Sequence, residues 1–261
     1  MFSIEKYTQV VKLVLGETTK YFFLLLLVVL VVRLWRRVSK TTGKNRQSTA
    51  GFAFLLTAAT VATGYVSMQH SLAQLNLAYA MQAFAAGRVP AALSLFQHAE
   101  ERWKSPEALG GEGVCLLLLD QKTEGLRLLQ AAKTSRTGRS SSFEEHYAGV
   151  YYFFHDEPEN AFPLLKGSCT DGRYQWSSLK LLAVILLEKN QPADAAELMS
   201  PFRQAEIREV DQAYVFASLQ LWENKGSEAR AVIERFPPET LPRFWKPRFN
   251  KLRSQTESAK S

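Results

Sequence analysis

Hydrophobic residues are concentrated in the first quarter of the chain, and short amphipathic stretches fill the rest. An unbroken apolar run over 21–32 lies within the stretch 18–35, which has Lys20 and Arg33 near its ends. A helix of about 18–20 residues crosses a hydrocarbon core, so this stretch predicts a membrane span. A second uncharged stretch, 48–68, is rich in Ala, Thr and Gly, which favours close packing on the first. We therefore predict a transmembrane helical hairpin over 18–68; a buried first helix of the following domain is the alternative for 48–68.

Positive charge lies between these two stretches, in the predicted loop 33–47, which contains no acidic residue. The whole net charge of +7 lies within the first 68 residues, and the remainder of the chain is balanced. Short loops of this kind stay in the cytoplasm, so we expect residues 69–261 outside it, in the periplasm of a Gram-negative cell. The loop is also expected to contact anionic lipid headgroups. The residues concerned are Arg33, Arg36, Arg37, Lys40, Lys44 and Arg46.

Nucleic-acid binding is not expected, because the basic loop is short and lacks interleaved aromatic residues. Residues 1–17 precede the first predicted span, and apolar side chains recur at helical spacing within them, from Phe2 to Leu15. This spacing favours an amphipathic helix at the interface or against a partner. A plain leading turn is equally compatible with it.

A repeated pattern of small and bulky residues runs through the remainder of the chain. A small residue is followed four positions later by a bulky apolar one, as in Ala92 and Phe96. The same pair recurs with spacings of 33, 36, 34 and 34 residues. The small leading residues are Ala92, Gly125, Ala161, Ala195 and Ala229. Another small residue stands twelve positions before each of them, where two helices can cross closely: Ala80, Gly113, Gly149, Ala183 and Ala217.

This pattern resembles the tetratricopeptide repeat (TPR), a helix–turn–helix unit of about 34 residues. The resemblance covers roughly residues 73–242, although the family's tryptophan near the start of each unit is missing. It implies an all-α protein in which an α-solenoid of about five TPR-like repeats, within 69–242, follows the membrane hairpin. A generic helical bundle with accidental spacing is the alternative. The basic and aromatic residues in 243–261 predict a capping helix and a frayed tail.

The sequence contains no convincing catalytic motif, so we expect neither an enzyme nor a cofactor. His155, Asp156, Glu157 and Glu159 could in principle hold a metal ion, but they fall where a turn is expected. Cys115 lies in an apolar helix and Cys169 in a loop, and their pairing is left open.

Binding of another protein is therefore the expected activity. Stacked helical hairpins present a concave face built from the first helix of each unit. The register of the TPR family places five candidate binding residues on that face: His146, Phe153, Lys180, Tyr214 and Trp222. For Phe153 and Trp222, packing between units is an equally good interpretation. The repeat region is mildly acidic, which favours a basic or neutral partner.

Two functions follow from this organisation. The first is a membrane-anchored scaffold or assembly factor that binds a protein or peptide, expected to be a component of a membrane complex. Its topology is similar to that of the membrane-bound chaperones of cytochrome c maturation, although no sequence motif is shared. The second is a permanent structural or accessory subunit of a larger integral membrane complex.

Overall fold

The computed structural model describes residues 22, 24–40, 45–202 and 206–258, and no strand occurs among them. The all-helical prediction is confirmed for this part of the chain. The candidate amphipathic segment 1–17 lies outside the described residues. The chain divides into two compact units, Met1–Leu109 and Gly110–Ser261.

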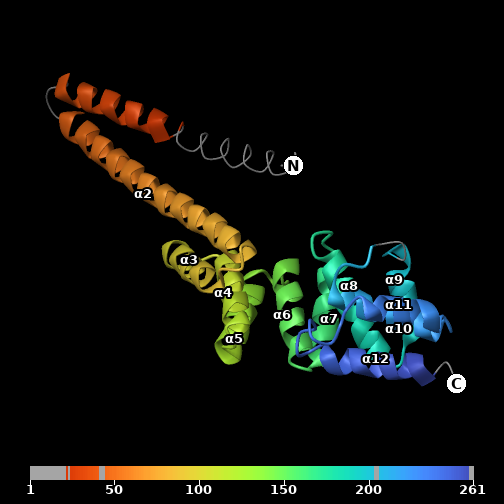
Figure 1. Ribbon diagram of the computed structural model, residues 1–261. Helices are drawn as coiled ribbons and strands as arrows, with labels where there is room; N and C mark the ends of the chain where they lie inside the picture. Colours follow the sequence, from red (N-terminus) through yellow and green to blue (C-terminus); the bar gives the residue numbers. More distant parts are fainter. Residues whose placement is uncertain (1–21, 23, 41–44, 203–205, 259–261) are drawn as a thin grey trace. The chain divides into compact units, whose positions relative to one another are not determined.

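The helices follow one another along the chain with short connections (Figure 1). A helix over residues 24–40 comes first. It is followed by α2 (Asn45–Ala85), α3 (Val89–Arg102), α4 (Pro106–Leu118), α5 (Lys122–Ser135), α6 (Ser142–Phe154), α7 (Pro158–Ser168), α8 (Gln175–Glu188), α9 (Pro192–Met199), the 3-10 turn η1 (Ser200–Phe202), α10 (Val210–Trp222), α11 (Gly226–Glu234) and α12 (Lys246–Ser258).

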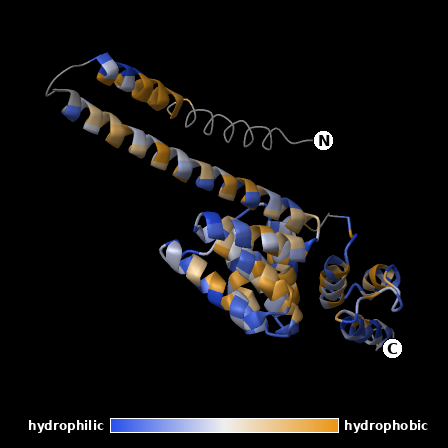
Figure 2. Cartoon of the chain, turned by 90° about the vertical axis from the view of Figure 1, so that its left-hand side faces the viewer, coloured by the Kyte–Doolittle hydropathy of each residue, from blue (hydrophilic) through white to orange (hydrophobic). Residues whose placement is uncertain are grey.

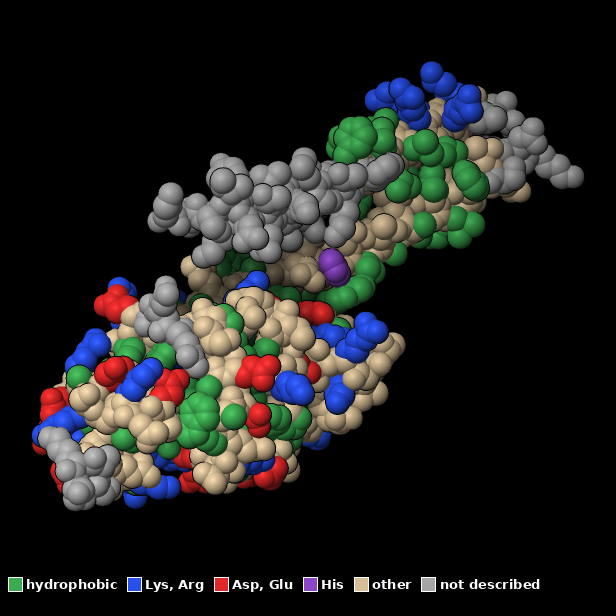
Figure 3. All heavy atoms as spheres, turned by 90° about the vertical axis from the view of Figure 1, so that its right-hand side faces the viewer, with side chains coloured by type: hydrophobic (Ala, Val, Ile, Leu, Met, Phe, Trp, Pro, Cys, Tyr) green, Lys and Arg blue, Asp and Glu red, His purple; other side chains and the backbone are tan. Residues whose placement is uncertain are grey.

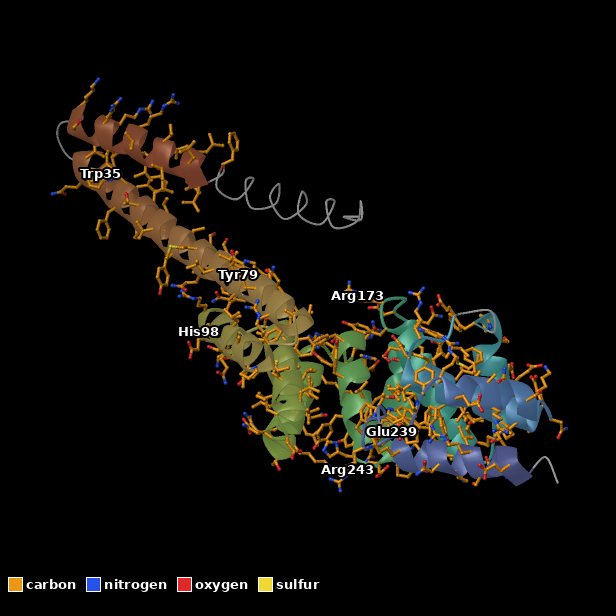
Figure 4. The ribbon with its side chains drawn as sticks, viewed as in Figure 1. Trp35, Tyr79, His98, Arg173, Glu239 and Arg243 are labelled. Carbon is orange, nitrogen blue, oxygen red and sulfur yellow. The ribbon has the colours of Figure 1, made fainter. Side chains whose placement is uncertain are left out.

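In the first unit, helix 24–40 lies against α2. The indole Nε1 of Trp35 donates a hydrogen bond of 3.0 Å to Oγ1 of Thr57, and Trp35 points from its own helix toward α2 (Figure 4). A Cβ atom at Gly64 would lie 3.3 Å from Cδ2 of Leu24, so a small residue permits the close approach there. Part of the predicted first span, residues 18–21 and 23, lies outside the described residues.

The second predicted span is part of one uninterrupted helix. α2 has 41 residues and is therefore about 60 Å long, roughly twice the thickness of a hydrocarbon core. By length and composition, its stretch Thr49–Ala85 could cross a membrane, and most of its apolar surface is exposed. Figure 2 shows apolar residues along helix 24–40 and along α2. The same helix extends to Ala80, which the repeat pattern assigned to the first helix of the first repeat.

Cationic side chains gather at one end of this unit, next to a surface of apolar side chains (Figure 3). Arg33, Arg36, Arg37 and Lys40 are all exposed in the last two turns of helix 24–40. The side chains of Lys44 and Arg46 lie outside the described residues. The described cations are therefore accessible, while their contact with lipid remains a prediction.

The repeated small residues lie where the two helices of each pair cross. All ten of them are buried, in α2 through α11. The closest approach is between α4 and α5, where a Cβ at Gly113 would lie 2.9 Å from the carbonyl oxygen of Gly125. A Cβ at Gly125 would lie equally close to the carbonyl oxygen of Gly113. Only glycine fits at both positions without moving the backbone.

The turn between the two helices of each pair contains one residue whose backbone is in the left-handed region, with a positive φ angle. These residues are Gly87, Asp120, Asp156, Asn190 and Asn224, with φ between 55° and 72°, and their spacing is that of the small residues. In the second pair the N–H of Gln121 donates to the carbonyl of Leu116 at 2.8 Å, and the other four turns have the equivalent bond. This is the Schellman arrangement, which satisfies the last carbonyls of a helix. The repeat therefore includes the turn as well as the crossing.

We expect Ala195→Leu to lower the free energy of unfolding by about 1–3 kcal/mol, because Ala195 is completely buried in α9 and added volume overpacks the crossing. Ala193→Leu, on the same helix at an exposed position, is the matched control and should change stability by less than about 0.5 kcal/mol. Denaturant titration of the full chain, followed by circular dichroism, measures both. Equal effects of the two substitutions would contradict the crossing.

Candidate protein-binding site

The inner face of the second unit is formed by α6, α8 and α10, the first helices of three successive repeats. His146 and Phe153 come from α6, Lys180 from α8, and Tyr214 and Trp222 from α10. The first four are buried, with 3–7 % of each residue exposed, whereas Trp222 is 48 % exposed. Most of the candidate binding residues therefore form the floor and walls of this face, and Trp222 is the one open to solvent.

His146 is held inside the inner face by polar and aromatic neighbours. Its Nδ1 lies 2.8 Å from Oγ of Ser178, and its ring stacks on Tyr174 with centroids 4.9 Å apart. Burial disfavours the charged imidazolium and lowers the pKa of His146 to about 4. The imidazole is therefore neutral at pH 7 and serves as a packed, hydrogen-bonded side chain.

Lys180 is paired within the chain. Its Nζ contacts Glu209 and lies 2.9 Å from Oδ2 of Asp211, at the start of α10. The ammonium group also lies 5.4 Å from the centre of the Trp176 ring. The cation thus ties α8 to the start of α10, and its charge is already compensated by two carboxylates.

The C-terminal residues of the chain, 241–258, fold back over the inner face and are called the closing segment here. Phe244 lies 5.2 Å from Phe153 and 4.8 Å from Phe154, measured between ring centroids. Trp245 lies 5.7 Å from Tyr214, and both side chains are buried. The closing segment therefore reaches from α10 back to α6 and covers the middle of the inner face.

Arg248 fastens this segment through three interactions. Its Nε donates to Oε1 of Glu188 at 2.6 Å, and its Nη2 lies 3.3 Å from Oδ1 of Asp156, in the turn between α6 and α7. The guanidinium also lies 3.8 Å from the centre of the Phe244 ring. One side chain thus joins the closing segment to two repeats.

Two hollows remain open on either side of the closing segment. The first has a volume of about 270 Å³ and lies between α6, α8 and the start of α10. Its lining includes His146, Tyr147, Phe154, Leu181, Asp211 and Trp245. The second, of about 310 Å³, lies between α10 and α12 and is lined by residues that include Tyr214, Trp222, Lys251 and Gln255. The five predicted residues are therefore not brought into one groove, because the closing segment separates His146 from Trp222.

Of the four residues considered for a metal ion, His155, Asp156 and Glu157 lie between α6 and α7, and Glu159 lies in the first turn of α7. Nε2 of His155 lies 3.4 Å from Oδ1 of Asp120, and Nζ of Lys122 lies 2.5 Å from Oε1 of Glu157. These contacts align the turns of two neighbouring repeats. Among the described residues, no group of three or more potential metal ligands occurs. Cys115 and Cys169 are both free thiols.

Sequence reasoning missed Phe154, Trp245 and Arg248 as parts of this face. The basic and aromatic residues of 243–261, which include Trp245 and Arg248, predict only a cap, and no sequence pattern singles out Phe154. The pairing of Arg248 with Asp156 joins residues 92 positions apart, and no local pattern indicates such a contact.

We expect Arg248→Met to loosen the closing segment, because the variant loses two ion pairs and a cation–π contact while keeping most of the side-chain volume. The cost should be about 1–2 kcal/mol, since the carboxylates of Asp156 and Glu188 are partly exposed. Hydrogen exchange of residues 241–258 should accelerate in this variant. Arg243→Met is the control at an exposed position, and equal exchange in the two variants would contradict the fastening role.

We expect acid to weaken the fold through His146. The folded pKa is lower than the unfolded value of 6.5, so the unfolded chain binds more protons between pH 6.5 and about 4. The stability contributed by the neutral imidazole is thus complete above pH 6.5 and is lost as the pH falls through that window. His146→Gln should remove about 1–2 kcal/mol of the stability difference between pH 7 and pH 4.5. Denaturant titrations at both pH values measure it, and an unchanged difference would exclude His146 as its source.

Comparison with known proteins identifies the fold. No protein-family model and no curated protein matches the sequence. Among solved structures, pilF of Pseudomonas aeruginosa is similar over 73 % of this chain and 90 % of its own, with a TM-score of 0.52 and 16 % identity. YrrB is described as a TPR protein with an unusual peptide-binding site. It is similar over 71 % of this chain and 90 % of its own, with a TM-score of 0.46 and 13 % identity. A TPR protein of Parabacteroides merdae is similar over 92 % of this chain and 96 % of its own, with a TM-score of 0.41 and 11 % identity. The similarity to pilF and the helical pairs described above show that the fold is an array of helical hairpins, which is consistent with a TPR-like solenoid.

Proposed function

We propose that this chain is a membrane-anchored scaffold that binds a segment of another protein on the inner face of its repeats. The observation that carries the proposal is the first hollow, which three successive repeats line and which is open beside an exposed aromatic residue, Phe154. Aromatic side chains in a hollow of this kind are typical anchors for a partner's apolar side chain.

The residues that line the first hollow indicate which kind of side chain a bound segment would place in it. Its walls are mainly apolar and aromatic, and the charge of Lys180 beside it is compensated by Glu209 and Asp211. A carboxylate of the partner therefore has no uncompensated cation to meet at Lys180. We infer that the hollow accepts one large apolar side chain from a neutral or basic segment.

The anchor is the hairpin of helix 24–40 and α2, with the basic end in the cytoplasm. Its support is the exposed apolar surface of α2 and the row of exposed cations at one end of the unit. This orientation places the repeats outside the cytoplasm, and in the periplasm if the cell is Gram-negative. Anionic lipid headgroups are the expected contacts of the cationic end.

A permanent subunit of a membrane complex is the second candidate. The observation in its favour is that exposed apolar side chains continue along α2 past residue 68, to Leu75 and Tyr79. A stripe of this kind is typical of a helix that packs on another protein. Purification from mild-detergent membranes separates the two candidates, because a subunit retains its partners in fixed stoichiometry and an assembly factor does not.

We expect a photo-crosslinking residue at Phe154 to capture a partner in native membranes, because Phe154 lines the first hollow and 44 % of it is exposed. The same residue at Glu197, exposed on α9, a second helix of its repeat, is the control. A partner captured at Phe154 and not at Glu197 supports the proposal. Capture that is equal at the two positions, or absent at both, contradicts the inner face as the binding site.

A further inference from the structure

A chain of buried hydrogen bonds behind the first hollow ends on the ring of His146. Oγ of Ser168 lies 2.8 Å from the carbonyl oxygen of Leu165 and 2.7 Å from Oγ of Ser178. Oγ of Ser178 in turn lies 2.8 Å from Nδ1 of His146. Ser168, Ser178 and His146 are all buried, so each of these polar groups needs a partner inside the protein.

Only one arrangement of protons makes all of these bonds. A carbonyl oxygen can only accept, so the hydroxyl of Ser168 donates to Leu165, and its oxygen accepts from Ser178. The single hydroxyl proton of Ser178 is thereby used, and Nδ1 of His146 has to donate to Ser178. Because the imidazole is neutral at pH 7, its one proton lies on Nδ1 and its Nε2 carries a lone pair that accepts hydrogen bonds.

This lone pair has no partner in the part of the chain that the structure describes. The hydrogen bond of His146 runs through Nδ1, and the one fully buried side-chain polar atom without a partner among the described residues is Oε1 of Gln220. Nε2 is therefore accessible, although only 6 % of His146 is exposed. Tyr174 stacks on the ring, Tyr147 meets it edge-on, and the open space that His146 lines is the first hollow.

We propose that the first hollow selects a tryptophan or tyrosine side chain of the partner, whose N–H or O–H group donates to Nε2 of His146. The inference rests on the function proposed above, and it narrows the large apolar side chain expected there to an aromatic one with a donor. Ser168 and Ser178 are positioning residues, because neither lines the hollow and both act through the ring of His146.

The walls of the first hollow fit an aromatic ring better than a flexible cation. They include Val150, Phe154, Leu181 and Trp245, against which a ring can pack. A buried indole or phenol group needs a hydrogen-bond partner, whereas a phenylalanine ring would leave the lone pair of Nε2 covered and unpaired. A lysine ammonium also donates, but the carboxylate of Asp211 in this hollow is already paired with Lys180 and does not replace the water that the ammonium would lose.

The first measurement determines which nitrogen of His146 is protonated. In the full chain in lipid nanodiscs, isotope-labelled histidine gives ring signals from four residues in nuclear magnetic resonance, and His146→Gln identifies those of His146. We expect a protonated Nδ1 and an unprotonated Nε2 at pH 7. In Ser168→Ala, the proton of Ser178 loses its acceptor, so Ser178 should donate to Nδ1 and the ring proton should move to Nε2. Ser218→Ala is the matched control, because its hydroxyl also donates to a helix carbonyl, that of Tyr214, but is not part of the chain of bonds.

The second measurement determines which side chains bind. The probes are N-acetyltryptophanamide, its derivative methylated on the indole nitrogen, N-acetyltyrosinamide and N-acetylphenylalaninamide, titrated while the ring signals of His146 are followed. Loss of the donor should weaken binding about 3- to 10-fold, both on methylation of the tryptophan probe and from the tyrosine to the phenylalanine probe. Ser168→Ala should remove these differences, because a protonated Nε2 cannot accept, whereas a purely steric effect of the methyl group would persist. The signals of exposed His98 report nonspecific binding and should stay in place.

The possible failures separate the inference from the proposed function. If no probe shifts the signals of His146, the first hollow is not an aromatic pocket, and the proposed function loses its site together with this inference. If the phenylalanine probe binds as tightly as the tryptophan and tyrosine probes, the hollow stands and the selection of a donor is wrong. If Nε2 is protonated in the natural sequence, or if Ser168→Ala leaves the ring proton on Nδ1, the two serines do not set the acceptor and the inference fails.

Discussion

The close crossing of two helices in each repeat is the constraint on which the second unit depends. Two α-helices can cross this closely only where the side chains at the crossing are small. At Gly113 and Gly125 an added Cβ atom would lie 2.9 Å from the carbonyl oxygen of the other glycine. The left-handed residue in each turn complements this crossing, because it reverses the chain within a few residues and satisfies the last carbonyls of the first helix. Crossing and turn recur at the same spacing, so each pair of helices is built in nearly the same way.

Stacking of the pairs generates the inner face, and the closing segment then determines how much of that face stays open. Phe244 and Trp245 bury their rings against Phe153, Phe154 and Tyr214, and Arg248 fastens the segment to two repeats. The face is thereby reduced to two hollows. A partner's side chain that enters the first hollow contacts the closing segment at Trp245 as well as the repeats.

The first unit is organised differently, because two parts of one long helix, α2, have different structural roles. The N-terminal part of α2 presents apolar side chains outward, while its C-terminal part pairs with α3 through buried Ala80, Ala83 and Phe84. Because α2 is continuous, the orientation of the first repeat is linked to that of the apolar stretch without a flexible joint. The contacts of Arg102 and Trp103 with residues 69–70 strengthen this link.

The sequence by itself determined the helical class, the spacing of the repeats and the two apolar stretches, because these depend on local periodicity and on side-chain size at fixed intervals. It also indicated the turn around Asp156, which the structure has between α6 and α7. Only the tertiary structure decided which candidate residues remain accessible. Lys180 is compensated by Glu209 and Asp211, and Phe153 and Tyr214 are covered by residues more than 30 positions away. Such contacts depend on the path of the whole chain, and no local pattern of residue types encodes them.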